Sequence, residues 1–109
     1  MELTLAGIDN RADFERAEVE LPSFDVADMQ TKGKEDPRWI HLGPGNIFRA
    51  FPARVAHDMI ADGEHWPITA VVPMNPEELD KQLGANDLMT LTVTLNPDGT
   101  RDLKVIAGI

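Results

Sequence analysis

The sequence contains no cysteine, which excludes disulfides and thiolate metal sites and is consistent with a reducing compartment. Basic residues are also scarce: 10 lysines and arginines stand against 19 acids, and the formal net charge is -9. Such a charge opposes binding to nucleic acids or to anionic membranes. No apolar run approaches the roughly 20 residues of a membrane span, and the N-terminus lacks the pattern of a signal peptide. We therefore expect a soluble, cytoplasmic protein with one small core.

The acidity is distributed unevenly along the 109 residues. Residues 1–36 carry 10 acids and 4 bases, whereas residues 37–109 carry 9 acids and 6 bases. We interpret residues 1–36 as a polar N-terminal lead-in and residues 37–109 as the main folding unit. Because a dinucleotide is an anion, the less acidic second part is where one would bind.

Two short helices are expected in the lead-in. The first covers Arg11–Val19 after a possible cap at Asn10, and the second covers Val26–Gln30 after a possible cap at Asp25. The charged run at residues 31–37 predicts a solvated loop. This loop would lead the chain into its first strand.

Two glycines mark the centre of the chain. The apolar run Trp39–Leu42 predicts a strand buried on both faces, as in a parallel sheet. Gly43 and Gly45 follow it directly, and helical spacing begins after them. Strand, glycine turn and helix are the elements of a βα turn that binds phosphate, although a third small residue is expected where this chain has Phe48. The competing interpretation is an ordinary glycine-rich βα loop.

The segment after the glycines has the spacing of a helix that packs on a sheet. Pro52 implies that the regular helix either begins near this residue or is kinked there. Gly63 is expected to end the helix. The apolar positions of this predicted face are Phe48, Phe51, Val55, Ala56, Met59 and Ile60.

The three histidines do not form an evident catalytic group. His41 lies inside the first strand and is expected to be a hydrogen-bonded core residue. His57 and His65 are isolated in the sequence and are expected to have exposed side chains. No metal site is predicted.

A second buried strand is predicted at Ile68–Val72, which would complete a βαβ unit. A short helix should follow, capped by Asn75, with Pro76 in its first position, and ending at Gly84. In dinucleotide-binding folds the end of the second strand usually offers an acid to the ribose. Residues 73–75 contain no carboxylate, so the sequence does not choose between NAD and NADP.

From Leu88 the apolar period changes to two, and the residues 96–99 (Asn-Pro-Asp-Gly) predict the turn of a β-hairpin with one apolar face. The sequence stops within the second strand of this hairpin, so we expect the chain to be a truncated form of a longer protein. The open edge of the hairpin could mediate self-association.

The stretch Trp39–Phe51 resembles the N-terminal motif of the polyol-specific long-chain dehydrogenases, the group containing mannitol dehydrogenase and the fructuronate and tagaturonate reductases. The segment Asp87–Leu91 and the hairpin are also similar to this family. The resemblance implies a metal-independent oxidoreductase that uses NAD or NADP to interconvert a polyol or aldonate with a ketose or ketouronate. It also implies a second, mostly helical domain with the catalytic residues, which is absent here. The residues expected around the cofactor diphosphate are Gly43, Gly45, Asn46, Ile47, Phe48 and Arg49.

Together these observations predict an α/β fold, namely a partial Rossmann-type βαβ unit with an added β-hairpin and a helical N-terminal lead-in. Residues 1–36 would form the lead-in and residues 37–109 the first part of the NAD(P)-binding domain. We expect the chain to bind the cofactor but to be inactive alone, and we assign no catalytic residue. The alternative is an acidic Rossmann-like interaction module that binds no nucleotide.

Overall fold

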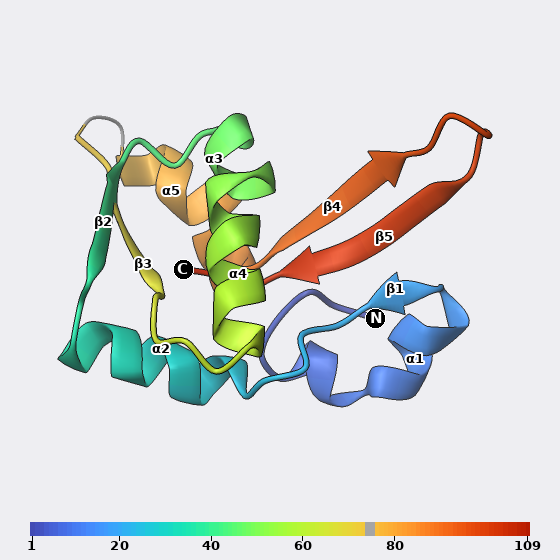
Figure 1. Ribbon diagram of the computed structural model, residues 1–109, viewed down its shortest axis with the longest axis horizontal. Helices are drawn as coiled ribbons and strands as arrows, with labels where there is room; N and C mark the ends of the chain where they lie inside the picture. The colour runs from blue at the N-terminus through green and yellow to red at the C-terminus, as the bar shows by residue number, and fades with distance from the viewer. Residues whose placement is uncertain (74–75) are drawn as a thin grey trace.

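The computed structural model describes residues 1–73 and 76–109, and in this part of the chain helices alternate with short strands (Figure 1). The elements are η1 (Gly7–Asp9), α1 (Arg11–Arg16), β1 (Val19–Glu20), α2 (Val26–Glu35), β2 (Trp39–Leu42), α3 (Asn46–Ala50), α4 (Pro52–Ala61), β3 (Ile68–Val71), α5 (Pro76–Gln82), η2 (Gly84–Asn86), β4 (Thr90–Leu95) and β5 (Arg101–Ile106). None of these helices is long and apolar enough to cross a membrane.

The predicted βαβ unit is present. Strands β2 and β3 are parallel, with Trp39 opposite Ile68 and Leu42 opposite Val71, and α3 and α4 connect them. A second sheet has the order β1-β5-β4, with β4 and β5 antiparallel. Figure 1 shows α4 between the two sheets. The expected α/β class, with its partial Rossmann-type unit and added hairpin, is thus confirmed.

The prediction that Trp39–Leu42 is buried on both faces was wrong, and the strand predicted at Ile68–Val72 ends at Val71 and is buried only in part. Ile40 and Leu42 are 64% and 71% exposed, and Val71 is 39% exposed. Successive residues of a strand point to opposite faces, and here α3 and α4 cover only the face that carries Trp39 and Ile68. The other face of this two-stranded sheet is open to solvent.

The helix after the glycine turn is divided at Pro52. Phe51 separates α3 from α4 with φ -117° and ψ -72°, and Pro52 takes the first position of α4. Proline fits this position because its missing N–H would have no intrahelical acceptor. The regular helix therefore begins at Pro52, the first of the two alternatives.

The C-terminal end of α4 forms as predicted. Gly63 adopts φ +92°, its N–H donates to Ile60 O at 3.0 Å, and the N–H of Glu64 donates to Met59 O at 3.0 Å. This pair of bonds is the Schellman motif, which satisfies carbonyls left free at the end of a helix.

The predicted apolar face of this helix was partly wrong. Phe51 is 67% exposed and Val55 is 39% exposed, whereas Ala53, Ala56 and His57 are buried. The break at Phe51 explains the difference. The prediction assumed one continuous helix, whereas α3 and α4 are separate, so residues on either side of Phe51 do not share one face. Phe48 packs with Ala53, Ala56, Ile68 and Ile106 in one of two core clusters.

The lead-in contributes a strand that the sequence did not indicate. Val19 and Glu20 pair in parallel with Leu103 and Lys104 of β5, so the first helix ends at Arg16 rather than Val19. Burial of Val19 in the larger core cluster outweighs its place in a helical pattern. That cluster contains Phe14, Val19, Leu21, Val26, Met29, Met89, Val105 and Ala107.

The second lead-in helix is longer than predicted and takes up most of the expected loop at residues 31–37. Asp25 caps it by accepting a hydrogen bond from the N–H of Asp28 at 3.0 Å, as predicted. Gly33 lies against Pro67, a contact that only the folded chain can provide. The other predicted cap was wrong, since the Asn10 side chain makes no capping bond and donates instead to Asp13.

The hairpin forms with its turn at the predicted residues, but its apolar face is buried only near the base. Met89 and Val105 are fully buried, while Leu91, Val93 and Leu95 become increasingly exposed toward the tip. Beyond β5 the chain runs beside β3, where the N–H of Ile68 donates to Gly108 O at 2.7 Å. This bond joins the two sheets.

The helix predicted after the second strand is present as α5, with Pro76 as its first residue, and it ends at Gln82 before the short turn η2. Its proposed cap, Asn75, lies outside the described residues.

Candidate functional site

The glycine turn is held against the carboxyl end of the parallel strands. The N–H of Gly43 donates to Val71 O at 2.9 Å, and the N–H of Gly45 donates to Gly43 O at 3.0 Å across Pro44. Gly43 adopts φ +87°, a conformation that residues with a Cβ rarely adopt. Gly43 is therefore explained by the backbone of the turn itself.

The presence of glycine at position 45 is not explained by the backbone conformation. Its φ of -80° and ψ of -173° are open to any residue, so the backbone does not require glycine here. A Cβ added at this position would meet nothing within 4 Å. What glycine provides at position 45 is therefore open space in front of the start of α3.

The start of α3 presents backbone donors to this space. The N–H of Arg49 makes the first bond of the helix, to Gly45 O at 3.0 Å, so the N–H groups of Asn46, Ile47 and Phe48 have no intrahelical acceptor. Gly45 occupies the cap position without a side chain that could accept from them. Such a helix start favours an anionic ligand.

A hollow of about 550 Å³ lies directly over the turn. It contains five of the six residues expected around the diphosphate, Arg49 being the exception. The side chain of Ile47 is 81% exposed beside it. The lining residues are His41, Gly43, Gly45, Asn46, Ile47, Phe48 and Pro52.

Arg49 lies at the end of α3, next to this hollow in the sequence but not in its lining. One guanidinium nitrogen, Nη2, donates to the Asn46 side-chain oxygen, and Nε is buried without a hydrogen-bond partner among the described residues. A buried guanidinium N–H normally has an acceptor. The Nε of Arg49 thus lacks an acceptor within the described residues, although it is not exposed to the hollow.

His41 is a lining residue that the sequence interpretation missed. Its ring stacks on that of Phe48, with centroids 4.2 Å apart and planes at 19°, and within the described residues its side chain makes no hydrogen bond. The expectation of a hydrogen-bonded core histidine was therefore wrong. Phe48 takes the place of the usual third glycine because its ring fills the space between α3 and β2. No spacing rule relates these two positions.

His57 is buried and not exposed as predicted. It is 3% exposed, and its ring lies edge-on to Phe24 at a centroid distance of 5.0 Å. Burial, and secondarily the charge of Lys104, lower the pKa of His57, so the neutral ring is favoured. His57 faces the core rather than the hollow over the glycine turn.

His65 is half-buried and was also predicted as exposed. Its Nε2 lies 3.2 Å from the backbone oxygen of Asp36 and 3.8 Å from the carboxylate of the same residue. This contact fixes the entry to β3 against the end of α2.

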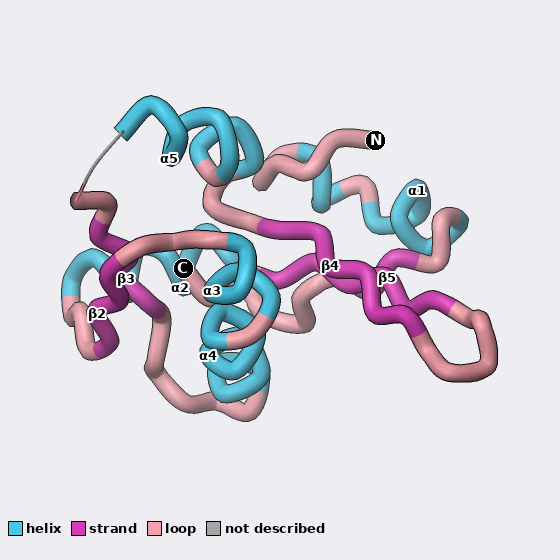
Figure 2. The backbone as a smooth tube through the Cα atoms, turned by 90° about the horizontal axis from the view of Figure 1, so that it is seen from above, coloured by secondary structure: helices cyan, strands magenta, loops and turns pink. Residues whose placement is uncertain are grey.

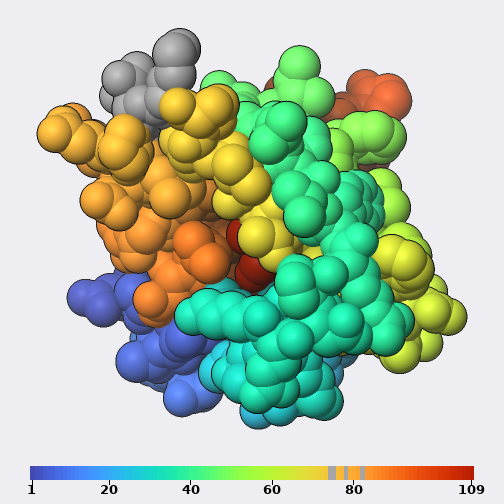
Figure 3. Space-filling model, turned by 90° about the vertical axis from the view of Figure 1, so that its left-hand side faces the viewer, coloured from blue at the N-terminus to red at the C-terminus, as the bar shows by residue number. Residues whose placement is uncertain are grey.

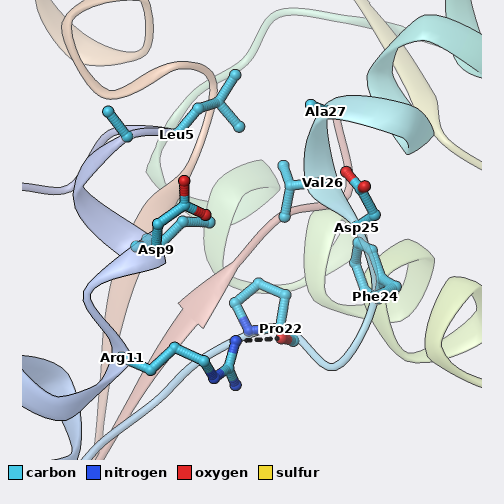
Figure 4. Close-up of a pocket in the computed structure, with 10 residues that line it drawn as sticks. Leu5, Asp9, Arg11, Pro22, Phe24, Asp25, Val26 and Ala27 are labelled. Atoms are coloured by element: carbon cyan, nitrogen blue, oxygen red, sulfur yellow. Dashed lines mark hydrogen bonds between the residues drawn. The ribbon is translucent and has the colours of Figure 1, made fainter.

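Two further cavities lie away from the glycine turn and have different linings. One, of about 550 Å³, lies in the lead-in between Asp9 and Asp25, and Arg11 donates to Pro22 O at 3.5 Å at its edge (Figure 4). Two carboxylates make it unsuited to an anionic cofactor. The other, of about 210 Å³, lies between α2, β3 and α5, where the C-terminal residues are visible at its floor (Figure 3).

The position at which dinucleotide-binding folds usually place a ribose-binding acid is only partly described. Pro73 comes two residues after the end of β3, whereas Met74 and Asn75 lie outside the described residues. None of the three is acidic.

Comparisons with known proteins relate this chain to dehydrogenases. It is 34% identical over 110 residues to D-mannonate oxidoreductase of Thermotoga maritima, covering 100% of this chain and 20% of that protein. It is 32% identical over 73 residues to D-arabinitol 4-dehydrogenase of Klebsiella pneumoniae, covering 65% of this chain and 16% of that protein. No family model matches the sequence.

Two solved structures share the fold. Mannitol 2-dehydrogenase of Pseudomonas fluorescens, in a ternary complex with NAD and D-mannitol, gives a TM-score of 0.67 at 25% identity, covering 84% of this chain and 18% of that one. A substrate-free D-sorbitol dehydrogenase gives a TM-score of 0.71 at 22% identity, covering 85% and 19%. The chain thus spans about a fifth of the length of the relatives that it matches.

Proposed function

Because this chain is homologous to the N-terminal region of the polyol dehydrogenases, we propose that its glycine turn binds the diphosphate of NAD or NADP within a longer dehydrogenase. The observation that carries the proposal is the conformation of Gly45. Its backbone does not need glycine, a Cβ there would meet nothing within 4 Å, and the next three N–H groups have no intrahelical acceptor. A glycine that the backbone conformation does not need is expected where a ligand approaches the backbone closely.

The residues at the turn fit a diphosphate. The N–H groups of Asn46, Ile47 and Phe48 supply donors at the positive end of α3, and Gly43 and Gly45 keep the approach open. The Arg49 guanidinium adds a positive charge at the other end of the same short helix. When bound, the nicotinamide would supply the hydride acceptor or donor of the reaction.

The substrate we propose is an open-chain polyol or aldonate, which the whole enzyme interconverts with a ketose or ketouronate. The names of the relatives support this class, since they include mannonate, arabinitol and mannitol enzymes. The general base would lie outside this chain. Lys104 is unsuited to the role because its Nζ lies 3.0 Å from Glu20 and 3.6 Å from Asp58 and is largely buried.

The proposal is tested by titrating the 109-residue chain with NADH and NADPH while the fluorescence of Trp39 and Trp66 is recorded. We expect saturable binding that Gly45→Val abolishes. Gly84→Ala is the control, because a Cβ at Gly84 meets Asp80 at an ordinary 3.5 Å and this glycine lies away from the turn. Binding that survives Gly45→Val would contradict the assigned site.

The activity is tested on the longer protein that contains this chain. NAD(H)- or NADP(H)-linked oxidation of mannonate, mannitol or arabinitol is expected there, with Gly45→Val raising the KM for the cofactor. Absence of any such activity, together with absence of cofactor binding to the 109-residue chain, would overturn the proposal.

A further inference from the structure

Within the described residues, the side chain of His41 is the one ionisable group that lines the hollow over the glycine turn. Five of the other lining residues are glycine or apolar, and the sixth is Asn46. The side-chain oxygen of Asn46 already accepts a hydrogen bond from Arg49. A ligand in the hollow would therefore meet a single side chain whose charge can change.

Contacts within the chain hold the His41 ring at this place. The ring stacks on Phe48, with centroids 4.2 Å apart and planes at 19°, and its neighbour across the sheet is the small Ala70 of β3. Residues beyond position 109 are not needed to place it. Phe48 covers one face of the ring, and within the described residues neither ring nitrogen makes a hydrogen bond. The two nitrogens therefore remain free to bind a ligand.

The elements packed around His41 carry few other charges. α3 contributes Arg49, α4 contributes Arg54 and Asp58, and the four residues of β3 contribute none. Arginine and aspartate side chains ordinarily keep their charge between pH 6 and pH 8. His57, also on α4, is buried in the core, and in Figures 1 and 2 the hairpin and α1 lie on the far side of α4 from β2. A change in the charge of the hollow near neutral pH would thus come from His41.

We propose that the imidazole of His41 donates a hydrogen bond to the cofactor diphosphate, and that protonation of this ring strengthens cofactor binding. The inference rests on the proposed function of the glycine turn. A neutral imidazole offers one N–H, whereas the protonated ring offers two and adds a positive charge beside the anion. Histidine ordinarily titrates between pH 5 and pH 8, so the affinity for the cofactor should rise as the pH falls through this range.

His41→Phe tests this inference in the longer protein that contains this chain, because that protein includes every segment that could cover the hollow. Phenylalanine keeps a ring that can stack on Phe48 but has no N–H, so a purely packing role for His41 predicts unchanged binding. Calorimetric titration with NADH at pH 6 and pH 8 gives the dissociation constants. NADPH is less suitable because its 2′-phosphate itself titrates at about pH 6.

We expect the wild type to bind NADH about fivefold more tightly at pH 6 than at pH 8, because the hydrogen bond becomes charge-assisted. In His41→Phe this difference should largely disappear, and binding at pH 6 should weaken about tenfold. His65→Phe is the matched control, since His65 contacts Asp36 and does not line the hollow. ADP-ribose, which has the diphosphate but no nicotinamide, should show the same effects. Far-UV circular dichroism establishes that each variant is folded.

Equal binding by His41→Phe and the wild type at both pH values overturns the inference, as does an equal loss in His41→Phe and His65→Phe. An effect of His41→Phe on NADH but not on ADP-ribose also overturns it, because the imidazole would then meet another part of the cofactor. In each of these cases NADH still binds and Gly45→Val still abolishes binding, so the proposed function stands. Failure of the wild type to bind either ligand would instead overturn the proposed function, and this inference with it.

Discussion

The ring nitrogen Nδ1 of His57 accepts a hydrogen bond from the backbone N–H of Ala107 at 3.0 Å, joining α4 to the end of β5. Acceptance requires the neutral ring, with the proton on the other nitrogen. The surrounding charges are Lys104 and Arg54, which disfavour protonation, and Asp58 and Glu20, which favour it, while burial dominates and lowers the pKa of His57.

His57 should make the folded state less stable in mild acid. An unfolded histidine titrates at about pH 6.5, whereas the folded pKa is lower, so the unfolded state binds more protons between these two values. The stability that the neutral His57 contributes is complete above about pH 6.5 and is lost as the pH falls through the folded pKa. Urea unfolding at several pH values checks this. In His57→Gln, which keeps an acceptor but cannot titrate, stability should fall less between pH 7.5 and 5.5 than in the wild type.

Substitution of the two glycines of the turn should affect different properties, namely stability at Gly43 and cofactor binding at Gly45. Gly43→Ala is expected to destabilise the fold by about 1 kcal/mol because φ is +87°. Gly45→Ala should change the free energy of unfolding by less than about 0.5 kcal/mol, since its φ is permitted and its Cβ would be free of contacts. Urea denaturation measures both, and NADH titration should show weakened binding in Gly45→Ala. Equal destabilisation by the two variants would contradict the distinction.

Phe48 should be a major contributor to the smaller core. Phe48→Ala removes a nearly fully buried ring that packs on Ala53, Ala56 and Ile68, and it takes the stacking partner from His41. A loss of about 3 kcal/mol is expected from transfer and cavity terms. Phe51→Ala is the control, because Phe51 is 67% exposed and should cost less than about 1 kcal/mol. Thermal and urea unfolding of the two variants make the comparison.

Gly108 should not tolerate any side chain. A Cβ there would collide with the backbone carbonyl of Ala53 in α4, and this backbone cannot move without disturbing the core. Gly108→Ala should therefore destabilise the fold by about 2 kcal/mol and weaken the bond to Ile68. Native-state hydrogen exchange at the Ile68 amide would report this directly. Unchanged protection in Gly108→Ala would show that α4 can shift away.

Local features of the fold followed from the sequence. The residues of β2 were predicted correctly because a short apolar run is bounded by Pro37 and Gly43, and the hairpin was predicted because its period of two surrounds a strong turn signal. The Asp25 cap and the helix end at Gly63 also depend only on near neighbours, as does the disturbance at Pro52, for which the sequence left a helix start and a kink as alternatives. The glycine turn was found in the same way.

Features that depend on residues far apart in the chain could not be predicted from the sequence. Val19 becomes a strand residue only because Leu103 lies beside it, and His57 is buried because Ala107 and Phe24 meet it. The His41–Phe48 stack likewise joins residues whose relation is set by how α3 lies on β2. The exposure of Ile40 and Leu42 follows from the number of strands in the sheet, which their own sequence does not specify.

The pairing of β1 with β5 also determines when the fold can be completed. Val19 must find Leu103, 84 residues later, before the third strand of its sheet exists. Closing so long a loop has an entropic cost that is recovered only at the end, which slows folding. On the ribosome the lead-in emerges before β5 and must wait until Leu103 has been synthesised. Its apolar residues Val19 and Leu21 lack their partners Val105 and Ala107 during that interval, so the lead-in offers a chaperone apolar contacts until β5 has been made.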